Sequence, residues 1–298
     1  MICSSRYSLH RLLTLVWLAL LSSHTLAAGK EIVVIGLPEF SERLNYIKDQ
    51  SPAANFVRAA VSKSLTAASS DGALPYTLSL VDNLSVSADQ KQWSFHLAKN
   101  KSFSNGAAIM SSDVMYSLRE CQRAGKLSYV SMVKGREGEF EAEGAEQWVD
   151  VYLSEAPTDA NRLALDLIDC PIVEKSSAEL FGEHLGQGTN LVGSGDFEVT
   201  AFKPQTEISL RRVTYQSRTG GLEELKFRGF RDPNQALAAI RIGTVDLFLT
   251  KDEVVLSKAR KDETLLVASC LGYSLVKRKG FLVNCEKSLD PLSFKYES

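Results

Sequence analysis

Apolar residues recur along this chain with two different periods, and the change from one period to the other predicts a mixed α/β protein. A β-branched apolar run over residues 31–36 predicts a buried first strand. Apolar residues at helical spacing follow over 53–68, and Ser51-Pro52 ahead of them is a typical helix start. Over residues 92–97 the pattern alternates, which predicts a strand with one buried face.

The middle of the chain adds one capped helix and several shorter segments. Ser111-Ser112-Asp113 precede apolar residues at helical spacing, so they predict a helix with a polar cap at its start. The stretch 135–147 holds five glutamates, and we expect an exposed loop or hairpin there. Residues 149–153 and 162–168 alternate like paired strands, and 178–185 predicts a short helix.

The second half of the chain predicts a hairpin followed by a strand–helix–strand unit. Residues 195–202 and 207–213 alternate like two antiparallel strands, with a turn at Lys203-Pro204-Gln205 between them. Next come a strand over 225–230, a helix over 233–242 that ends at Gly243, and a strand over 245–249. This order of elements is typical of parallel strand pairing, so we expect an α/β arrangement.

The first 28 residues have the pattern of a secretory signal peptide. Arg6 and Arg11 precede an apolar run over residues 12–21, and small residues end the segment at Ala27-Ala28. About ten residues rise about 15 Å as a helix, half of a bilayer core, which disfavours a membrane anchor. We therefore expect cleavage after Ala27 or Ala28 and export to the periplasm.

Export would place four cysteines in an oxidising compartment, because Cys3 lies in the leader. The four are Cys121, Cys170, Cys270 and Cys285, and they allow three pairings between which the sequence does not choose. The local candidate is Cys270 with Cys285, and free buried thiols are the alternative. No Cys-x-x-Cys spacing occurs among them, so a redox motif or zinc site has no support.

The charge and hydropathy of the chain exclude two classes of protein. Its 298 residues hold 34 Lys plus Arg and 36 Asp plus Glu, a formal net charge of −2. A nucleic-acid binder usually carries a basic surplus, which is missing here. Mean hydropathy is −0.08, which argues against a polytopic membrane protein. The length itself suggests two domains.

The glycine-rich stretch after residue 185 does not match the sequence motifs of dinucleotide or phosphate binding or of a nucleophilic serine. Leu191 stands where a dinucleotide fingerprint needs Gly or Ala, and Ser194 stands where a phosphate loop needs Lys. Past the leader the histidines are His96, expected on the surface, and His184, and neither a catalytic triad nor a metal site on them has support. We therefore expect a binding protein and no enzyme.

Two ordered stretches carry a resemblance to a known family. The first joins Trp93-Ser-Phe-His-Leu97, Phe103-Ser-Asn-Gly106 and Asp113-Val114, and the second joins Val192-Gly-Ser-Gly195, Phe202-Lys-Pro204 and Gly243-Thr-Val-Asp246. Together they resemble the family 5 extracellular solute-binding proteins of ABC importers, the peptide- and nickel-binding group. Departures such as Ala98 for the family's arginine and Asp196 for its proline indicate a divergent member.

The resemblance implies an α/β fold: a periplasmic binding protein-like lobe with an inserted smaller α+β domain. On that pattern residues 1–28 are the signal peptide, 29–61 and 186–250 form the first lobe, and 62–185 form the inserted domain. Residues 251–298 would begin a further lobe. Family members are usually longer chains, so we expect this C-terminal lobe to be truncated.

The same resemblance implies the periplasmic solute-binding component of an ABC importer, a monomer that binds peptides or similar small solutes and meets the membrane permease. The residues expected to face the ligand are Glu39, Phe40 and Ser41 after the first strand, and Gly193, Ser194 and Gly195 where the lobes cross. No catalytic residue, metal, cofactor or nucleic acid is expected. The alternative is a shortened, non-transporting relative that acts as a periplasmic sensor or interaction protein.

Overall fold

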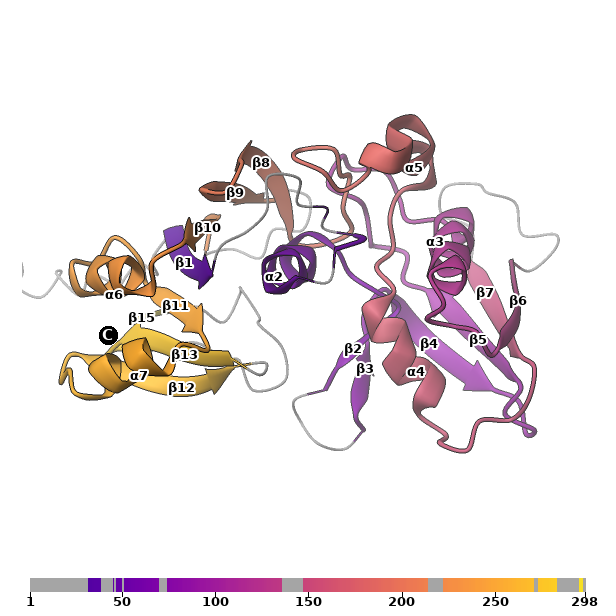
Figure 1. Ribbon diagram of the computed structural model, residues 1–298. Coiled ribbons are helices and arrows are strands. Elements are labelled where there is room, and N and C mark those ends of the chain that lie inside the picture. Colours follow the sequence, from indigo (N-terminus) through magenta and orange to yellow (C-terminus); the bar gives the residue numbers. More distant parts are fainter. Residues whose placement is uncertain are drawn as a thin grey trace, which may run out of the picture.

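The chain folds around two separate sheets, each with its own hydrophobic core (Figure 1). The computed structural model describes residues 32–38, 45, 47–49, 51–69, 74–135, 147–213, 222–270, 273–282 and 295–296. We call the part built on the seven-stranded sheet the large lobe, and the part built on the four-stranded sheet the small lobe. Within the described residues, no helix is long and apolar enough to cross a membrane.

The large lobe is a mixed sheet with the first strand of the chain near its middle. Strand β1 (Ile32–Pro38) pairs in parallel with β10 (Glu224–Phe230) on one side and with β11 (Leu247–Thr250) on the other. The remaining strands extend the sheet antiparallel, in the order β12-β13-β11-β1-β10-β9-β8. They are β8 (Phe197–Lys203), β9 (Glu207–Arg212), β12 (Leu265–Cys270) and β13 (Tyr273–Arg278).

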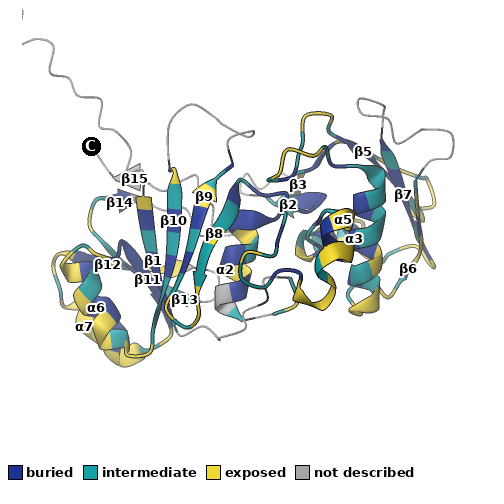
Figure 2. Cartoon of the chain, turned by 90° about the horizontal axis from the view of Figure 1, so that it is seen from above, coloured by how far each residue is buried: buried dark blue, intermediate teal, exposed yellow. Residues whose placement is uncertain are grey.

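Successive side chains along these strands point to opposite faces of the sheet, and each face carries a hydrophobic core. In β1, Val33 and Ile35 face the core beneath helix α2 (Pro52–Val61), while Val34 lies against the core beneath α6 (Pro233–Arg241) and α7 (Glu253–Arg260). Figure 2 shows the outward sides of α6 and α7 exposed above this second core. Both faces of the sheet are therefore covered, as parallel strands require.

The small lobe is an antiparallel sheet of order β4-β5-β7-β6, packed against α3 (Ser111–Arg123). Trp93 and Phe95 of β5 meet Leu118 of α3 in its core, and all three are at most 2% exposed. Its strands are β4 (Val81–Val86), β5 (Gln92–Leu97), β6 (Val130–Gly135) and β7 (Trp148–Leu153), with a hairpin of β2 (Thr66–Ala68) and β3 (Tyr76–Leu78) beside them.

Short elements complete the described chain. Helix α4 (Arg162–Asp166) continues into the 3-10 turn η1 (Leu167–Asp169), and α5 (Lys175–Phe181) continues into η2 (Gly182–His184). A small hairpin joins β14 (Phe281–Leu282) to β15 (Lys295–Tyr296). The small core takes its buried residues from Leu65 through Ile172, while Ala178 of α5 joins the large core. The domain boundaries expected from the sequence stay a prediction.

Most of the expected elements are confirmed, but the helix expected over 53–68 is too long. It ends at Val61, because Ser62 leaves the helix in an extended conformation and its amide closes the last turn on the Arg58 carbonyl. Residues 66–68 form β2 instead, where the Thr66 hydroxyl donates to the carbonyl of Ala164 at 2.6 Å. Because apolar residues continue at helical spacing past Val61, the sequence did not show the change from helix α2 to strand β2.

The strand expected over 162–168 is wrong, since this segment is α4 followed by η1. Leucines at 163, 165 and 167 alternate as in a strand, but the buried set is Leu163, Ala164 and Leu167, which is helical spacing. The short helix expected over 178–185 begins three residues earlier, at Lys175, and ends at Phe181. The acid-rich segment 136–146 and the leader 1–28 lie outside the described residues.

The cap of α3 also differs from the expected one. The N-cap residue is Met110, and Asp113 reaches back so that its carboxylate accepts from the Met110 amide at 2.9 Å. The other carboxylate oxygen of Asp113 accepts from the amide of Lys175 at 2.8 Å. One buried side chain therefore begins α3 and fastens α5 to it.

One of the three possible cysteine pairings is present: Cys121 at the end of α3 bonds to Cys170 after η1, with Cα atoms 5.9 Å apart. Both cysteines lie in the core of the small lobe. The free-thiol alternative is therefore wrong for this pair. The local candidate, Cys270 with Cys285, includes a residue outside the described ones and stays a prediction.

We predict that a Cys121→Ser/Cys170→Ser double variant loses about 2–4 kcal/mol of unfolding free energy, because the bond closes a long loop and both partners are buried. Urea unfolding followed by circular dichroism measures the loss. In a Cys270→Ser/Cys285→Ser background, a thiol reductant should produce a similar loss, and with all four cysteines replaced it should produce none. Full stability of that background under reductant would contradict the assignment.

Candidate functional site

The two lobes meet where three chain segments run side by side, and we call residues 61–64, 172–173 and 193–195 the lobe crossing. The Ile172 amide donates to the Lys63 carbonyl at 2.8 Å, and the Gly195 amide donates to the Val61 carbonyl at 3.0 Å. An isolated antiparallel bridge joins Val173 to Gly193. Backbone hydrogen bonds of the β type therefore connect the lobes at this point.

Glycine is required at two positions of the lobe crossing because the backbones approach too closely for a side chain. A Cβ atom on Gly193 would lie 1.9 Å from the Val61 carbonyl oxygen. A Cβ atom on Gly195 would lie 2.4 Å from the Ala60 carbonyl oxygen. Real Cβ contacts are never so short, so these glycines are determined by backbone packing.

Between the glycines, the Ser194 side chain is completely buried and bonded to backbone. Its hydroxyl group accepts from the Lys63 amide at 2.9 Å and donates its O–H to the Ile172 carbonyl at 2.8 Å. One side chain thus links all three segments of the lobe crossing. These contacts give Ser194 a structural role, and ligand binding by residues 193–195 stays a prediction.

A charged pair lies beside the lobe crossing. The Lys63 ammonium is 2.6 Å from a carboxylate oxygen of Asp196, and each side chain is about one quarter exposed, at 26% and 27%. Asp196 is the residue that departs from the proline of the family pattern. An ion pair between neighbouring segments therefore occupies the position where that pattern has a rigid ring.

A second feature is the edge of the large sheet where its parallel strands end, which we call the carboxyl edge. Because β1, β10 and β11 are parallel, Pro38, Phe230 and Thr250 lie at one edge (Figure 1). Ligands of open α/β sheets bind outside the carboxyl ends of the strands. The predicted site residues Glu39, Phe40 and Ser41 follow β1 directly in sequence, but they lie outside the described residues.

Two side chains at the carboxyl edge are not among the site residues predicted from the sequence. Lys251 follows β11 directly, and its ammonium lies over the Tyr273 ring, 4.4 Å from the centroid. Tyr273 begins β13 and its ring meets Phe56 of α2 edge to face, with centroids 6.3 Å apart. The parallel strand expected over 245–249 is a sequence signal that could have drawn attention to Lys251.

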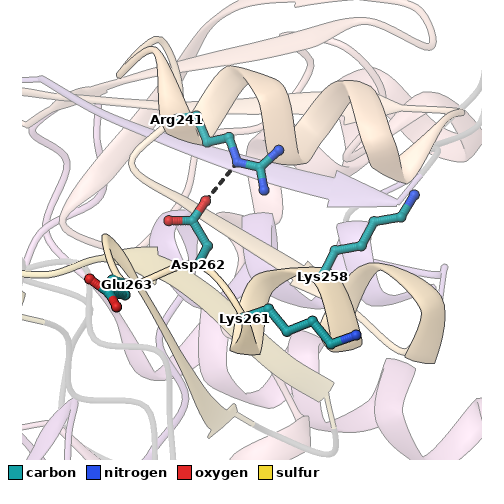
Figure 3. A pocket seen from close by; sticks show the side chains of 5 residues that line it. All are labelled: Arg241, Lys258, Lys261, Asp262 and Glu263. Carbon is teal, nitrogen blue, oxygen red and sulfur yellow. Dashed lines mark hydrogen bonds and ion pairs between the residues drawn. The ribbon is translucent and has the colours of Figure 1, made fainter.

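A shallow cavity of about 490 Å³ lies elsewhere, lined by Arg241, Lys258, Lys261, Asp262 and Glu263 (Figure 3). It lies where α6 and α7 end, just before β11 and β12 begin, and therefore at the opposite edge of the sheet from Thr250. Arg241 donates to the Asp262 carboxylate at 2.7 Å. Two of the charged residues that line the cavity are therefore already paired with each other. Ligands of open α/β sheets bind at the carboxyl ends of the strands, so the position of this cavity does not favour it as the solute site.

The histidines lie apart from both features. His96 Nδ1 is 2.5 Å from Asp82, its ring lies tilted against Trp148 with centroids 4.7 Å apart, and its side chain is only 13% exposed. The expectation of a surface histidine is therefore wrong, because those two neighbours cover it. His184 is exposed on η2. Across the described part of the chain, no group of three His, Cys, Asp or Glu residues is placed to hold a metal ion.

Comparison with known proteins assigns the chain to a family. Residues 75–278 match the family described as bacterial extracellular solute-binding proteins, family 5 Middle. The chain belongs to this family. The matched segment runs from the β2–β3 hairpin through β13 and so includes the lobe crossing segments 172–173 and 193–195, together with Lys251 and Tyr273. No curated protein matches the sequence.

Solved structures of solute-binding proteins share the fold of this family 5 chain. MoaA of A. tumefaciens R10, solved with mannopinic acid, has a TM-score of 0.68 at 18% identity, over 81% of this chain and 49% of its own. OppA of Listeria monocytogenes, solved with a peptide, has a TM-score of 0.66 at 14% identity, over 80% of this chain and 50% of its own. NikZ of Campylobacter jejuni, solved with Ni(L-His), has a TM-score of 0.64 at 16% identity, over 80% of this chain and 47% of its own. This chain spans about half the length of these structures.

We predict that Gly195→Ala destabilises the protein by about 3 kcal/mol or more, because its methyl group would displace the Val61–Ser62 backbone at the lobe crossing. Gly135→Ala is the matched control, since its Cβ would meet the flexible end of Met115 at 3.4 Å and the Ser111 hydroxyl at 3.7 Å, both ordinary contacts. Urea unfolding of both variants measures the difference. Equal stability of the two variants would contradict the close approach described here.

We also predict that the Asp262 carboxyl titrates with a pKa of about 2, because the Thr264 hydroxyl and the Arg241 guanidinium both donate to it. Its pKa is below the unfolded value, so its contribution to stability is present above about pH 4 and is lost as the pH falls toward 2. Thr264→Val should raise the pKa, and NMR titration of the carboxyl carbon measures it. Lys261→Ala is the control with no bond to Asp262, and an equal rise there would contradict the cause.

Proposed function

We propose that this chain is the periplasmic solute-binding component of an ABC importer and that it binds peptides or similar small solutes. The observation that carries the proposal is the combination, in a family 5 fold, of a lobe crossing made of backbone hydrogen bonds with a carboxyl edge of three parallel strands. Two lobes on a narrow connection are typical of proteins that close around a ligand. The solved relatives with peptide and Ni(L-His) support the same class of ligand.

Capture needs no covalent chemistry in this scheme. Only a few amide and carbonyl groups connect the two lobes at the lobe crossing. A small rotation of the backbone at this connection would therefore move each lobe as a rigid body. The candidate contacts are Glu39, Phe40 and Ser41, which follow β1 in sequence, and the backbone of Gly193, Ser194 and Gly195. The membrane permease of the transporter would then receive the solute from the closed protein.

A periplasmic location is part of the proposal. The pattern of residues 1–28 is that of a secretory leader, and the buried Cys121–Cys170 disulfide suits an oxidising compartment. Family 5 is a family of extracellular solute-binding proteins, which agrees with export.

Isothermal titration calorimetry of the exported chain against pools of di- to pentapeptides tests the proposal. We expect saturable binding, with a negative heat-capacity change as the lobes bury apolar surface. Circular dichroism on the same sample verifies that the protein is folded. Flat titrations of folded protein would contradict peptide binding, and capture of a periplasmic protein in place of a solute would favour the sensor or interaction role.

A further inference from the structure

One basic residue at the carboxyl edge differs from the basic residues of the two neighbouring helices, α6 and α7. Among the described residues, Lys251 has no hydrogen bond or ion pair, although its side chain is exposed and directly follows β11. The basic residues of neighbouring α6 and α7 are engaged. Arg241 bonds to Asp262, Lys258 to Asn234 and Arg260 to Glu253.

The acid nearest to Lys251 in sequence is already committed elsewhere. Asp252 is the N-cap of α7, and its carboxylate accepts from the amides of Val254 and Val255 at 2.9 and 3.0 Å. The Asp252 amide in turn donates to the buried Thr250 hydroxyl at 3.0 Å. These bonds fix the turn after β11 and leave the Lys251 ammonium without a neutralising carboxylate among the described residues.

The ammonium is nevertheless held in place by an aromatic ring. It lies 4.4 Å from the centroid of Tyr273, and Tyr273 is fixed in turn against Phe56, which is buried at 4% exposure. A cation over a ring face is attracted by the ring quadrupole and loses freedom before any ligand arrives. Preorganisation of this kind lowers the entropic cost of binding an anion.

We infer that Lys251, held by Tyr273, binds a carboxylate group of the solute at the carboxyl edge of the large lobe. The inference rests on the proposed function and adds the charge of the ligand to it. An unpaired ammonium takes an anion, and the half-buried ring of Tyr273 beside it favours an apolar portion next to that anion. For a peptide, the carboxylate at its C-terminus meets this description.

Paired peptide pools give the test. One pool contains di- to pentapeptides without Asp or Glu and with free carboxyl termini, and the other contains the same sequences amidated. Calorimetry should show that wild-type protein binds the free-acid pool about tenfold to a hundredfold more tightly, as expected for a charge-assisted hydrogen bond. Lys251→Ala should abolish this preference, and Lys251→Arg should retain most of it.

Lys261→Ala is the matched control, because this lysine lines the cavity at the opposite edge and should leave the preference unchanged. Thermal unfolding verifies that each variant is folded. A wild-type protein that binds both pools equally, or a Lys251→Ala variant that keeps the preference, would overturn the inference and leave peptide binding standing. Failure of wild-type protein to bind either pool would overturn the proposed function and this inference with it.

Discussion

Close backbone contact at the lobe crossing is the constraint on which the arrangement of this protein depends. Gly193 and Gly195 have no room for a Cβ atom, and the buried hydroxyl of Ser194 bonds to two other segments. Segments separated by more than a hundred residues are thereby aligned, although few side chains take part. The Cys121–Cys170 bond acts in the same region, since Cys170 lies two residues before Ile172, whose amide and carbonyl both bond within the crossing.

The large sheet contributes the second feature of the candidate site, which is its carboxyl edge. Parallel pairing of β1 with β10 and β11 brings three strand ends to one edge, with a core on each face. The antiparallel strand β13 then brings Tyr273 back to that edge, beneath Lys251. Among the described residues, the Lys251 ammonium there has no hydrogen bond or ion pair and contacts the Tyr273 ring. The anion-binding role that we infer rests on topology and on pairing, neither of which is a property of one residue.

Errors in the predicted elements have a common cause. Residues 163, 165 and 167 alternate as in a strand, yet Ala164 is the buried neighbour, because the segment packs beside β2 as a helix. Because apolar spacing continues past Val61, the sequence predicted a helix longer than α2. In the structure the chain becomes extended after Val61, where it enters the lobe crossing. Local patterns record which residues are apolar, and tertiary contacts decide which face they bury.

The sequence by itself determined the alternation of strands and helices, the strand–helix–strand unit of the large lobe and the ordered residues by which the family is identified. These properties depend on local spacing and on turn residues, so they can be derived from the chain alone. Only the tertiary structure decided that Cys121 pairs with Cys170, that Ser194 is buried and that Lys251 lies over Tyr273. Each of these depends on the distance between segments far apart in sequence, and that distance is fixed only when the sheets have formed.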